Sequence, residues 1–275
     1  MPSRKPHTIL FFLGASILAS TTCKGQFNEG DVAQRYSVLS DSLRRADSLL
    51  ASGDRASALV IYQATTPWKH NARWRYVLHL KCTADPGQAN RSTLDSLAHY
   101  GCSRKYLESD SLIWTIVGPV LRSSPYPALH RDPLVQFVDS LGELDQQVRD
   151  LPRSRENDGL IGATDSMNID LLYSAFRENG GYISSIGSIL ILIHVLSDHQ
   201  EHLAYFAQSI NEALLDQKLD SDTYGTIVDE FFWHTKNCQV FGTIGHSDDV
   251  PGLKWCDPER TVRLRKLMGM PATSE

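Results

Sequence analysis

Apolar residues recur at intervals of three and four along most of this 275-residue chain. That spacing places them on one side of an α-helix, so it predicts a protein built from amphipathic helices that pack against each other. We therefore expect an all-α fold of tetratricopeptide-like helical hairpins, followed by a helical C-terminal domain with at most one short extended segment. In the first part of the chain the pattern predicts helices over residues 31–50, 56–64, 72–84 and 89–100.

The predicted turns of this first part repeat at a fixed distance. Gly53 and Gly87 are 34 residues apart, and so are Ala64 and Ala98. Thirty-four residues is the period of tetratricopeptide repeats, and residues 46–64 resemble the turn and second helix of such a repeat. Two units are fewer than the ~3 that an independent stack needs, so another part of the chain should cap them. The alternative is an ordinary pair of helical hairpins.

Prolines mark a boundary near the middle of the chain, because proline is costly inside a helix. We predict a tetratricopeptide-like region over 26–120, a proline-rich linker over 121–134 and a helical domain over 135–275. Residues 152–159 are predicted to form a loop, and 239–244 a short extended piece. Residues 186–196 are apolar except for Gly187, Ser188 and His194, which predicts a central core helix. Helices are predicted over 134–151, 168–179, 184–203, 202–215, 222–234 and 258–268.

The first 25 residues have the pattern of a secretory signal peptide. Arg4 and Lys5 precede an apolar stretch over 9–19, which is followed by small residues. Because this stretch is far shorter than the ~20 residues of a membrane-spanning helix, we expect export to the periplasm or beyond and no transmembrane helix in the mature chain. Cleavage after Gly25 is one expectation. Cleavage before Cys23, which would then carry a lipid anchor, is the other.

The charge balance makes nucleic acid an unexpected partner. The chain carries 27 Lys and Arg against 32 Asp and Glu, with a pI near 6.0, whereas nucleic-acid-binding domains usually carry a basic face. Removal of residues 1–25 takes away three basic residues and no acid, so the mature net charge is −8.

Four cysteines remain after cleavage at Gly25, and an exported protein can keep disulfides. The pairs that need least chain closure are Cys82 with Cys102 and Cys238 with Cys256. The alternative is that the four are separate thiols, because free cysteine is among the most buried residue types.

Candidate chemistry lies on the predicted helices of the C-terminal half. His194, Asp198 and His202 follow one another in steps of four, which on one helix places them on one face. They could hold a metal ion or pass a proton, although no His-Glu-x-x-His signature is present; the alternative is the polar last turn of a core helix. Asp145 and Arg149 lie one helical turn apart and suit an ion pair.

A possible loop site follows at Gln239, Gly242 and Thr243, whose backbone amides could contact a ligand or form a structural turn. The sequence has no nucleotide-binding fingerprint and no Gly-x-Ser-x-Gly elbow, so we predict no cofactor.

The C-terminal half resembles a domain of unknown function found in exported proteins of Bacteroidetes-type bacteria, often behind tetratricopeptide-like helices. The resemblance rests on a pattern DQxxR, HxxxD and QxYGT, with Phe241 here in place of the Tyr. It implies a fold and candidate positions and no reaction. The matching residues are Asp145-Gln146 with Arg149, the segment 180–187, His194 with Asp198, Asp229, the run 239–243, and Arg265 before Gly269.

Two functions are compatible with these patterns. The first is an exported binding module of the cell envelope, whose helical repeats present a surface to an envelope protein. The second is an envelope hydrolase or metal-dependent enzyme. Its site would gather His194, Asp198, Asp145, Arg149 and Gln239.

Overall fold

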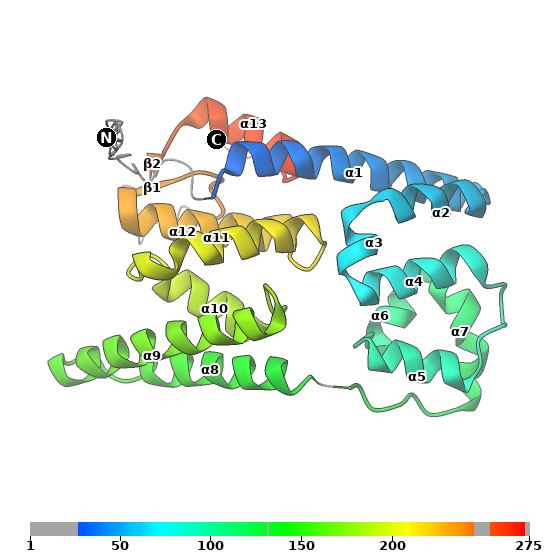
Figure 1. The fold of residues 1–275 in the computed structure, drawn as a ribbon, viewed down its shortest axis with the longest axis horizontal. Coiled ribbons are helices and arrows are strands. Elements are labelled where there is room, and N and C mark those ends of the chain that lie inside the picture. The colour runs from blue at the N-terminus through cyan, green and yellow to red at the C-terminus, as the bar shows by residue number, and fades with distance from the viewer. Residues whose placement is uncertain (1–26, 131, 245–253, 273–275) are drawn as a thin grey trace, which may run out of the picture.

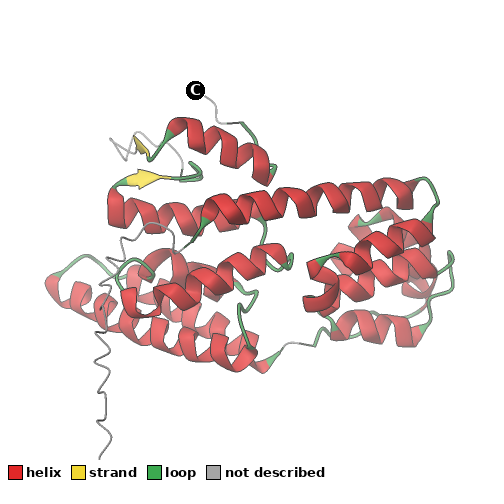
Figure 2. Cartoon of the chain, turned by 45° about the horizontal axis from the view of Figure 1, so that its top comes forward, coloured by secondary structure: helices red, strands yellow, loops and turns green. Residues whose placement is uncertain are grey.

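The computed structural model describes residues 27–130, 132–244 and 254–272. These residues form thirteen helices and two strands of two residues each, which confirms the predicted all-α class (Figure 2). The predicted signal segment, with its lipidation candidate Cys23, lies outside the described residues. Within those three ranges, none of the helices has the length and apolar content needed to cross a bilayer.

The helices predicted in the first part of the chain are present with nearly the predicted bounds. Gly53 and Gly87 form turns with φ of 90° and 75°, a backbone conformation that favours glycine. Pro67, predicted only to end a helix, lies in the first turn of an additional short one, where its missing N–H costs no hydrogen bond. These helices are α1 (Glu29–Ala51), α2 (Arg55–Ala64), α3 (Thr66–His70), α4 (Ala72–Thr83) and α5 (Arg91–His99), followed by α6 (Arg104–Ser109) and α7 (Ser111–Ser123).

Helix α4 lies between two apolar clusters of the N-terminal block, a name we use for residues 40–123. Its Leu78 and Cys82 pack with Ala58 and Tyr62 on the side of α1 and α2. Its Val77 belongs to the other cluster, which α5, α6 and α7 complete. Because α4 has apolar neighbours on both sides, it ties successive hairpins together, as helices do in stacked repeats.

The proline-rich linker begins later than predicted, because α7 continues through Pro119 to Ser123. A proline inside a helix leaves the carbonyl four residues before it without its usual N–H donor. Here the carbonyl of Thr115 accepts a hydrogen bond from the backbone N–H of Gly87 instead, at 3.1 Å. The loop between α4 and α5 therefore supplies the donor that the Thr115 carbonyl lacks. As a result α7 continues past Pro119, and the connection between α7 and α8 is shorter than predicted, residues 124–132.

The C-terminal half differs from prediction at two places. Residues 155–159, predicted as loop, belong to α9, because the Ser154 hydroxyl accepts a hydrogen bond from the Asn157 N–H at 3.1 Å and caps an earlier start. The predicted continuous helix over 184–203 is broken, since α10 ends at Val195 and α11 begins at Gln200. The helices are α8 (Pro133–Arg149), α9 (Arg155–Asn179), α10 (Ile186–Val195), α11 (Gln200–Leu215), α12 (Ser221–Lys236) and α13 (Pro258–Met268).

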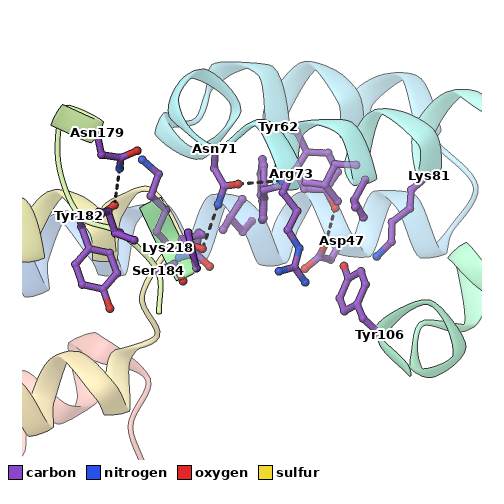
Figure 3. Close-up of a pocket in the computed structure, with 17 residues that line it drawn as sticks. Asp47, Tyr62, Asn71, Arg73, Lys81, Tyr106, Asn179, Tyr182, Ser184 and Lys218 are labelled. Carbon is purple, nitrogen blue, oxygen red and sulfur yellow. Dashed lines mark hydrogen bonds between the residues drawn. The ribbon is translucent and has the colours of Figure 1, made fainter. Parts of the chain in front are cut away.

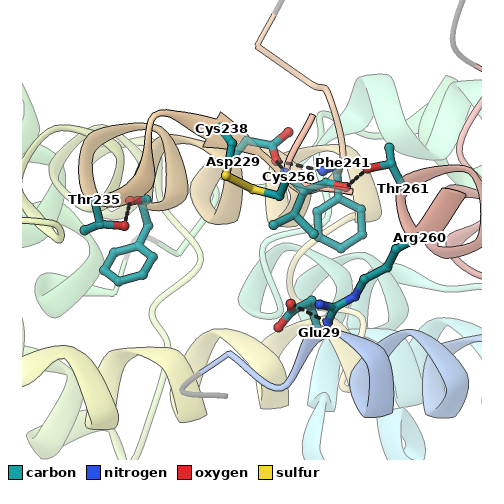
Figure 4. The surroundings of a disulfide bond; sticks show 10 residues. Glu29, Asp229, Thr235, Cys238, Phe241, Cys256, Arg260 and Thr261 are labelled. Atoms are coloured by element: carbon teal, nitrogen blue, oxygen red, sulfur yellow. Dashed lines mark hydrogen bonds and ion pairs between the residues drawn. A yellow bond between two sulfur atoms is a disulfide. The ribbon is translucent and has the colours of Figure 1, made fainter. Parts of the chain in front are cut away.

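Two short strands, rather than one extended piece, connect α12 to α13. β1 (Cys238–Gln239) and β2 (Lys254–Trp255) pair in parallel. A disulfide between Cys238 and Cys256 joins their ends, as one of the two predicted local pairings requires (Figure 4).

The other predicted pairing is wrong, because Cys82 and Cys102 are buried free thiols. The physical reason is that they lie in different clusters of the N-terminal block, Cys82 beside α2 and Cys102 beside α5 and α7.

Helix α1 crosses from one half of the molecule to the other (Figure 1). Its second half pairs with α2, whereas Phe27, Val32 and Ala33 at its start are buried in the core of the C-terminal half. The Asn211 amide donates a hydrogen bond to the carbonyl of Phe27 at 2.7 Å, which holds the chain before α1. The predicted boundary at 121–134 is therefore incomplete: the C-terminal block, as we use the name below, consists of residues 27–39 and 133–272.

Candidate functional site

The two blocks enclose a cleft of about 730 Å³ that is lined by side chains from both (Figure 3). A volume of this size is typical of ligand-binding pockets, which commonly span about 300–1,000 Å³. The N-terminal block contributes Leu43, Asp47, Tyr62, Asn71, Arg73, Trp74, Val77, Leu78, Lys81 and Tyr106, and the C-terminal block contributes Val135, Asn179, Tyr182, Ile183, Ser184, Gln217 and Lys218.

Asn71 connects the two blocks at this cleft. Its side-chain carbonyl accepts a hydrogen bond from the Trp74 N–H at 3.0 Å and caps the start of α4. Its amide nitrogen donates to the carbonyls of Asp216 and Gln217, at 3.2 and 3.3 Å, in the turn that follows α11. A residue that begins a helix in one block thus binds the backbone of the other.

Positively charged side chains occur on both sides of the cleft. The guanidinium of Arg73 lies over the ring of Tyr106, 5.1 Å from its centroid. Lys81 forms an ion pair with Asp110, and the Lys218 ammonium lies 3.7 Å from the Asp216 carboxylate.

The Tyr62 hydroxyl donates a hydrogen bond to Asp47 beside these cations. Burial and the Asp47 carboxylate both raise the pKa of Tyr62, so the hydroxyl keeps its proton and acts as a donor. Trp74 packs edge-on against the Tyr62 ring at 5.6 Å. The cleft therefore combines cationic donors with an aromatic wall.

A second polar cluster lies within the C-terminal block and gathers three of the five residues proposed for an enzyme site. Asp145 of α8 is fully buried, and His194 of α10 places its Nδ1 2.7 Å from the Asp145 carboxylate. The Nε of Arg149 donates to both oxygens of Asp145, at 3.1 and 3.2 Å. An Arg149 terminal nitrogen also binds Asp165 of α9 at 2.6 Å, and the Gln146 amide donates to Asp145 at 2.8 Å.

The surroundings set the charge of each carboxyl group in this cluster. Burial by itself would raise the pKa of Asp145, but the hydrogen bond and charge of His194, the charge of Arg149 and the Gln146 amide together lower it. Burial raises the pKa of Asp165, although the charge and hydrogen bond of Arg149 oppose the shift. Asp145 is thus held as a carboxylate, while Asp165 keeps its proton to higher pH.

The Asp145–His194 pair has the geometry of an oriented base. In the tautomer with its proton on Nδ1, His194 donates to Asp145 and keeps Nε2 as a proton acceptor. The side chain of His194 is 28% exposed. The imidazole that carries Nε2 is therefore in contact with water. A carboxylate–imidazole pair of this kind can remove a proton from water or from a substrate hydroxyl.

Asp198 and His202, two other candidates, do not join this cluster. The break between α10 and α11 separates both from the helix of His194, so the predicted shared face does not exist. Asp198 is exposed, and His202 binds Asp170 at 2.8 Å while stacking on Tyr173. Within the described ranges, no group of three or more His, Cys, Asp or Glu side chains is placed to hold a metal ion.

Gln239, Gly242 and Thr243 form a structural loop, which was one of the two alternatives for them. The buried Asp229 carboxylate accepts hydrogen bonds from the N–H groups of Val240, Phe241 and Thr243, at 2.6–2.7 Å, and from the Thr243 hydroxyl. The Gln239 side chain likewise accepts a hydrogen bond within this loop. We call the contacts of Asp229 with this loop the Asp229 clamp; Figure 4 shows Asp229 and Phe241 beside the disulfide.

Gly242 is needed in this loop for two reasons. Its φ is +69°, and an added Cβ would lie 2.0 Å from the ring of Trp255. The Arg265 guanidinium donates to the carbonyl of Phe241 at 2.6 Å and fixes the loop from α13. Asp229 and Arg265, which the resemblance singled out, thus have structural partners.

Sequence reasoning missed the cleft. Its residues are spread over α1, α2, α4, α6 and the C-terminal block, and no spacing links them. The sequence feature nearest to the cleft is Asn71, an asparagine directly before a predicted helix. Asparagine at that position indicates a helix cap. It does not indicate that the same side chain binds the other block.

Comparison with protein-family models, with curated proteins and with solved structures finds no match to this chain.

Proposed function

We propose that this protein is an exported helical binding module of the cell envelope, and that the cleft between its blocks receives a segment of an envelope protein. The observation that carries the proposal is the construction of the cleft: side chains from both blocks line it, and Asn71 ties the blocks together beside it. A pocket at the interface between two structural units is a common place for a ligand.

Export is part of the proposal and rests on two independent features. The N-terminal 25 residues have the order of a signal peptide, and Cys238 pairs with Cys256, a bond that oxidising compartments preserve. The resemblance to an uncharacterised exported family points the same way. Expression of the full chain with a C-terminal tag in a diderm bacterium, fractionation, and intact mass measurement test this step. We expect an envelope product that begins at Gln26, or at a lipidated Cys23; an unprocessed cytosolic product would contradict it.

Binding is tested by comparing the mature protein with a variant whose cleft is filled. Ser184 is exposed and lines the cleft, so Ser184→Trp should occupy the cleft without disturbing a core. Ser92→Trp adds the same side chain at an exposed position of α5 outside the cleft. We expect an envelope partner to be crosslinked by the wild type and by Ser92→Trp and lost with Ser184→Trp. Equal capture by all three proteins would contradict the cleft as the binding site.

The Asp145–His194 pair favours a second candidate function, that of an envelope hydrolase. The observation is the 2.7 Å contact that orients a partly exposed imidazole on a buried carboxylate. A panel of chromogenic esters, amides, phosphates and glycosides tests it. Hydrolysis should vanish with His194→Gln and persist with His199→Gln, a control on a histidine that binds Glu201 instead. Activity that survives His194→Gln would contradict His194 as the base, and absence of activity on every substrate class would contradict the hydrolase.

A further inference from the structure

Cations outnumber carboxylates among the side chains that line the cleft, although the mature chain is acidic. Arg73, Lys81 and Lys218 line it together with one carboxylate, Asp47, whereas the net charge without the signal segment is −8. Clefts lined by one sign of charge raise the local concentration of ligands of the other sign. A cleft lined by three cations and one carboxylate is therefore suited to an anionic ligand.

Arg73 is the cation most available to such a ligand. Lys81 and Lys218 already have Asp110 and Asp216 beside them. In the described part of the chain no carboxylate pairs with Arg73, which instead lies over the Tyr106 ring and near the buried Cys102 thiol. Figure 3 shows the Arg73 side chain pointing into the cleft on the side where Asp47 and Tyr106 lie. Stacking on a ring leaves the edge of a guanidinium free, and that edge can bind a carboxylate with two parallel hydrogen bonds.

The rest of the lining indicates what the anion is attached to. Tyr62, Trp74 and Tyr106 contribute aromatic rings, which we call the aromatic wall, and Leu43 and Val77 add apolar surface. Arg73 and Lys81 belong to the N-terminal block and Lys218 to the C-terminal block, so both blocks contribute cations. A ligand that complements this lining carries a carboxylate next to a bulky apolar group.

We infer that the cleft binds a short acidic peptide segment, in which a bulky apolar side chain contacts the aromatic wall and a neighbouring Asp or Glu carboxylate binds Arg73. This inference rests on the proposed function and names the chemistry of its partner. Lys81 and Lys218 contribute less attraction than Arg73, because Asp110 and Asp216 already neutralise much of their charge. Tyr106 holds the Arg73 guanidinium in place for the contact.

The experiment selects random dodecapeptides displayed on phage against the oxidised mature protein, residues 26–275, and measures selected peptides by fluorescence anisotropy. We expect enrichment of Asp and Glu next to an aromatic or large aliphatic residue. Arg73→Gln should weaken binding about tenfold or more, because a charge-assisted contact is lost. Arg75→Gln, on an exposed residue of the same helix outside the cleft, should leave the affinity unchanged. Added salt should weaken binding to the wild type more than to Arg73→Gln.

Each other outcome overturns a defined part of the argument. Selected peptides that lack acidic residues, or that bind Arg73→Gln as well as wild type, would refute the acidic-peptide inference; if Ser184→Trp still blocks them, the cleft remains a binding site and the proposed function stands. Selected peptides that Ser184→Trp does not affect would refute both. Failure to select any peptide, with the protein folded by circular dichroism, would also refute both.

Discussion

Gly142 of α8 and Gly187 of α10 are in direct backbone contact: a Cβ added to Gly142 would lie 2.5 Å from the Cα of Gly187. A Cβ on Gly187 would lie 2.1 Å from the carbonyl oxygen of Val138. The two helices can approach so closely only because neither glycine has a side chain. Farther along the same two helices, Asp145 meets His194 at 2.7 Å. The glycine crossing therefore sets the helix separation on which the polar pair depends.

Substitution of Gly187 by alanine should separate these helices and destabilise the protein. We expect the free energy of unfolding in urea to fall by about 1–3 kcal/mol, the usual cost of overpacking a tight contact. Gly162→Ala is the matched control, because Gly162 is also inside a helix and a Cβ there would meet nothing within 4 Å. That control should be neutral or stabilising by about 0.5–1 kcal/mol. Equal effects at the two positions would show that the crossing tolerates a side chain.

The ionised Asp145 should make stability depend on acid pH. Because His194, Arg149 and Gln146 lower its folded pKa below the unfolded value of about 3.9, its contribution is complete above that value and is lost as pH falls through the folded pKa. The difference in unfolding free energy between wild type and Asp145→Asn should therefore shrink as pH is lowered below about 4. Asp198→Asn, on an exposed carboxylate of the α10–α11 turn, should change stability by less than about 0.5 kcal/mol. A pH-independent difference for Asp145→Asn would contradict this prediction.

Disruption of the Asp229 clamp should release the loop at 240–243. Asp229→Asn replaces one acceptor oxygen by an NH₂ group that faces backbone N–H donors, and each unpaired buried donor costs about 1–3 kcal/mol. We expect a loss of at least about 2 kcal/mol in unfolding free energy. The amides of Val240, Phe241 and Thr243 should exchange hydrogen faster. Asp222→Asn, in the exposed first turn of the same helix, should cost less than about 1 kcal/mol and leave those amides protected.

The cysteines should fall into two classes when a protein of residues 26–275, produced under oxidising conditions, is alkylated. Cys82 and Cys102 are buried, and burial raises the pKa of both thiols, so neither should react in the native protein. Denaturation without reductant should expose two reactive thiols, and denaturation with reductant four, as counted by intact mass. Absence of reactive thiols in the unreduced denatured protein would mean that Cys82 and Cys102 pair after all.

Removal of the disulfide should destabilise the protein through the loop that it closes. The two cysteines are 18 residues apart, and closing a loop of that order is worth about 3 kcal/mol. We expect Cys238→Ser with Cys256→Ser to lower the free energy of unfolding by that amount, measured against wild type under oxidising conditions. The same comparison under reducing conditions is the control, and there the difference should nearly vanish.

Local patterns predicted individual helices well. The range predicted for the last helix, 258–268, is that of α13, and Gly53 and Gly87 are turn glycines as expected. Periodicity and turn residues report on contacts within a few residues, which is why such elements can be found in one sequence. One error arose where a local feature has a distant partner: Pro119 stays helical because the Gly87 N–H donates to the carbonyl that it frees. The other arose from a local cap, because Ser154 starts α9 earlier than the apolar pattern does.

The three residues that interrupt the apolar run 186–196 show which part of the candidate site the sequence could predict. The sequence marks Gly187, Ser188 and His194 as exceptions on a core helix. In the structure each has a partner on another element or turn: Gly187 contacts α8, the Ser188 hydroxyl donates to the carbonyl of Ile183 at 2.8 Å, and His194 binds Asp145. An interruption can be read from one sequence, but its partner cannot.

The sequence by itself determined the helical class, most helix bounds and the acidic charge, because each depends on composition or on short separations along the chain. Only the tertiary structure decided that the start of α1 belongs to the C-terminal core, that Cys82 and Cys102 are separated, and that a cleft lined by Arg73 opens between the blocks. These features depend on which amphipathic helices pack against each other, and many helices of the chain have similar apolar faces. The pairing is determined by packing between residues far apart in sequence. The spacing of residues along the chain does not predict it.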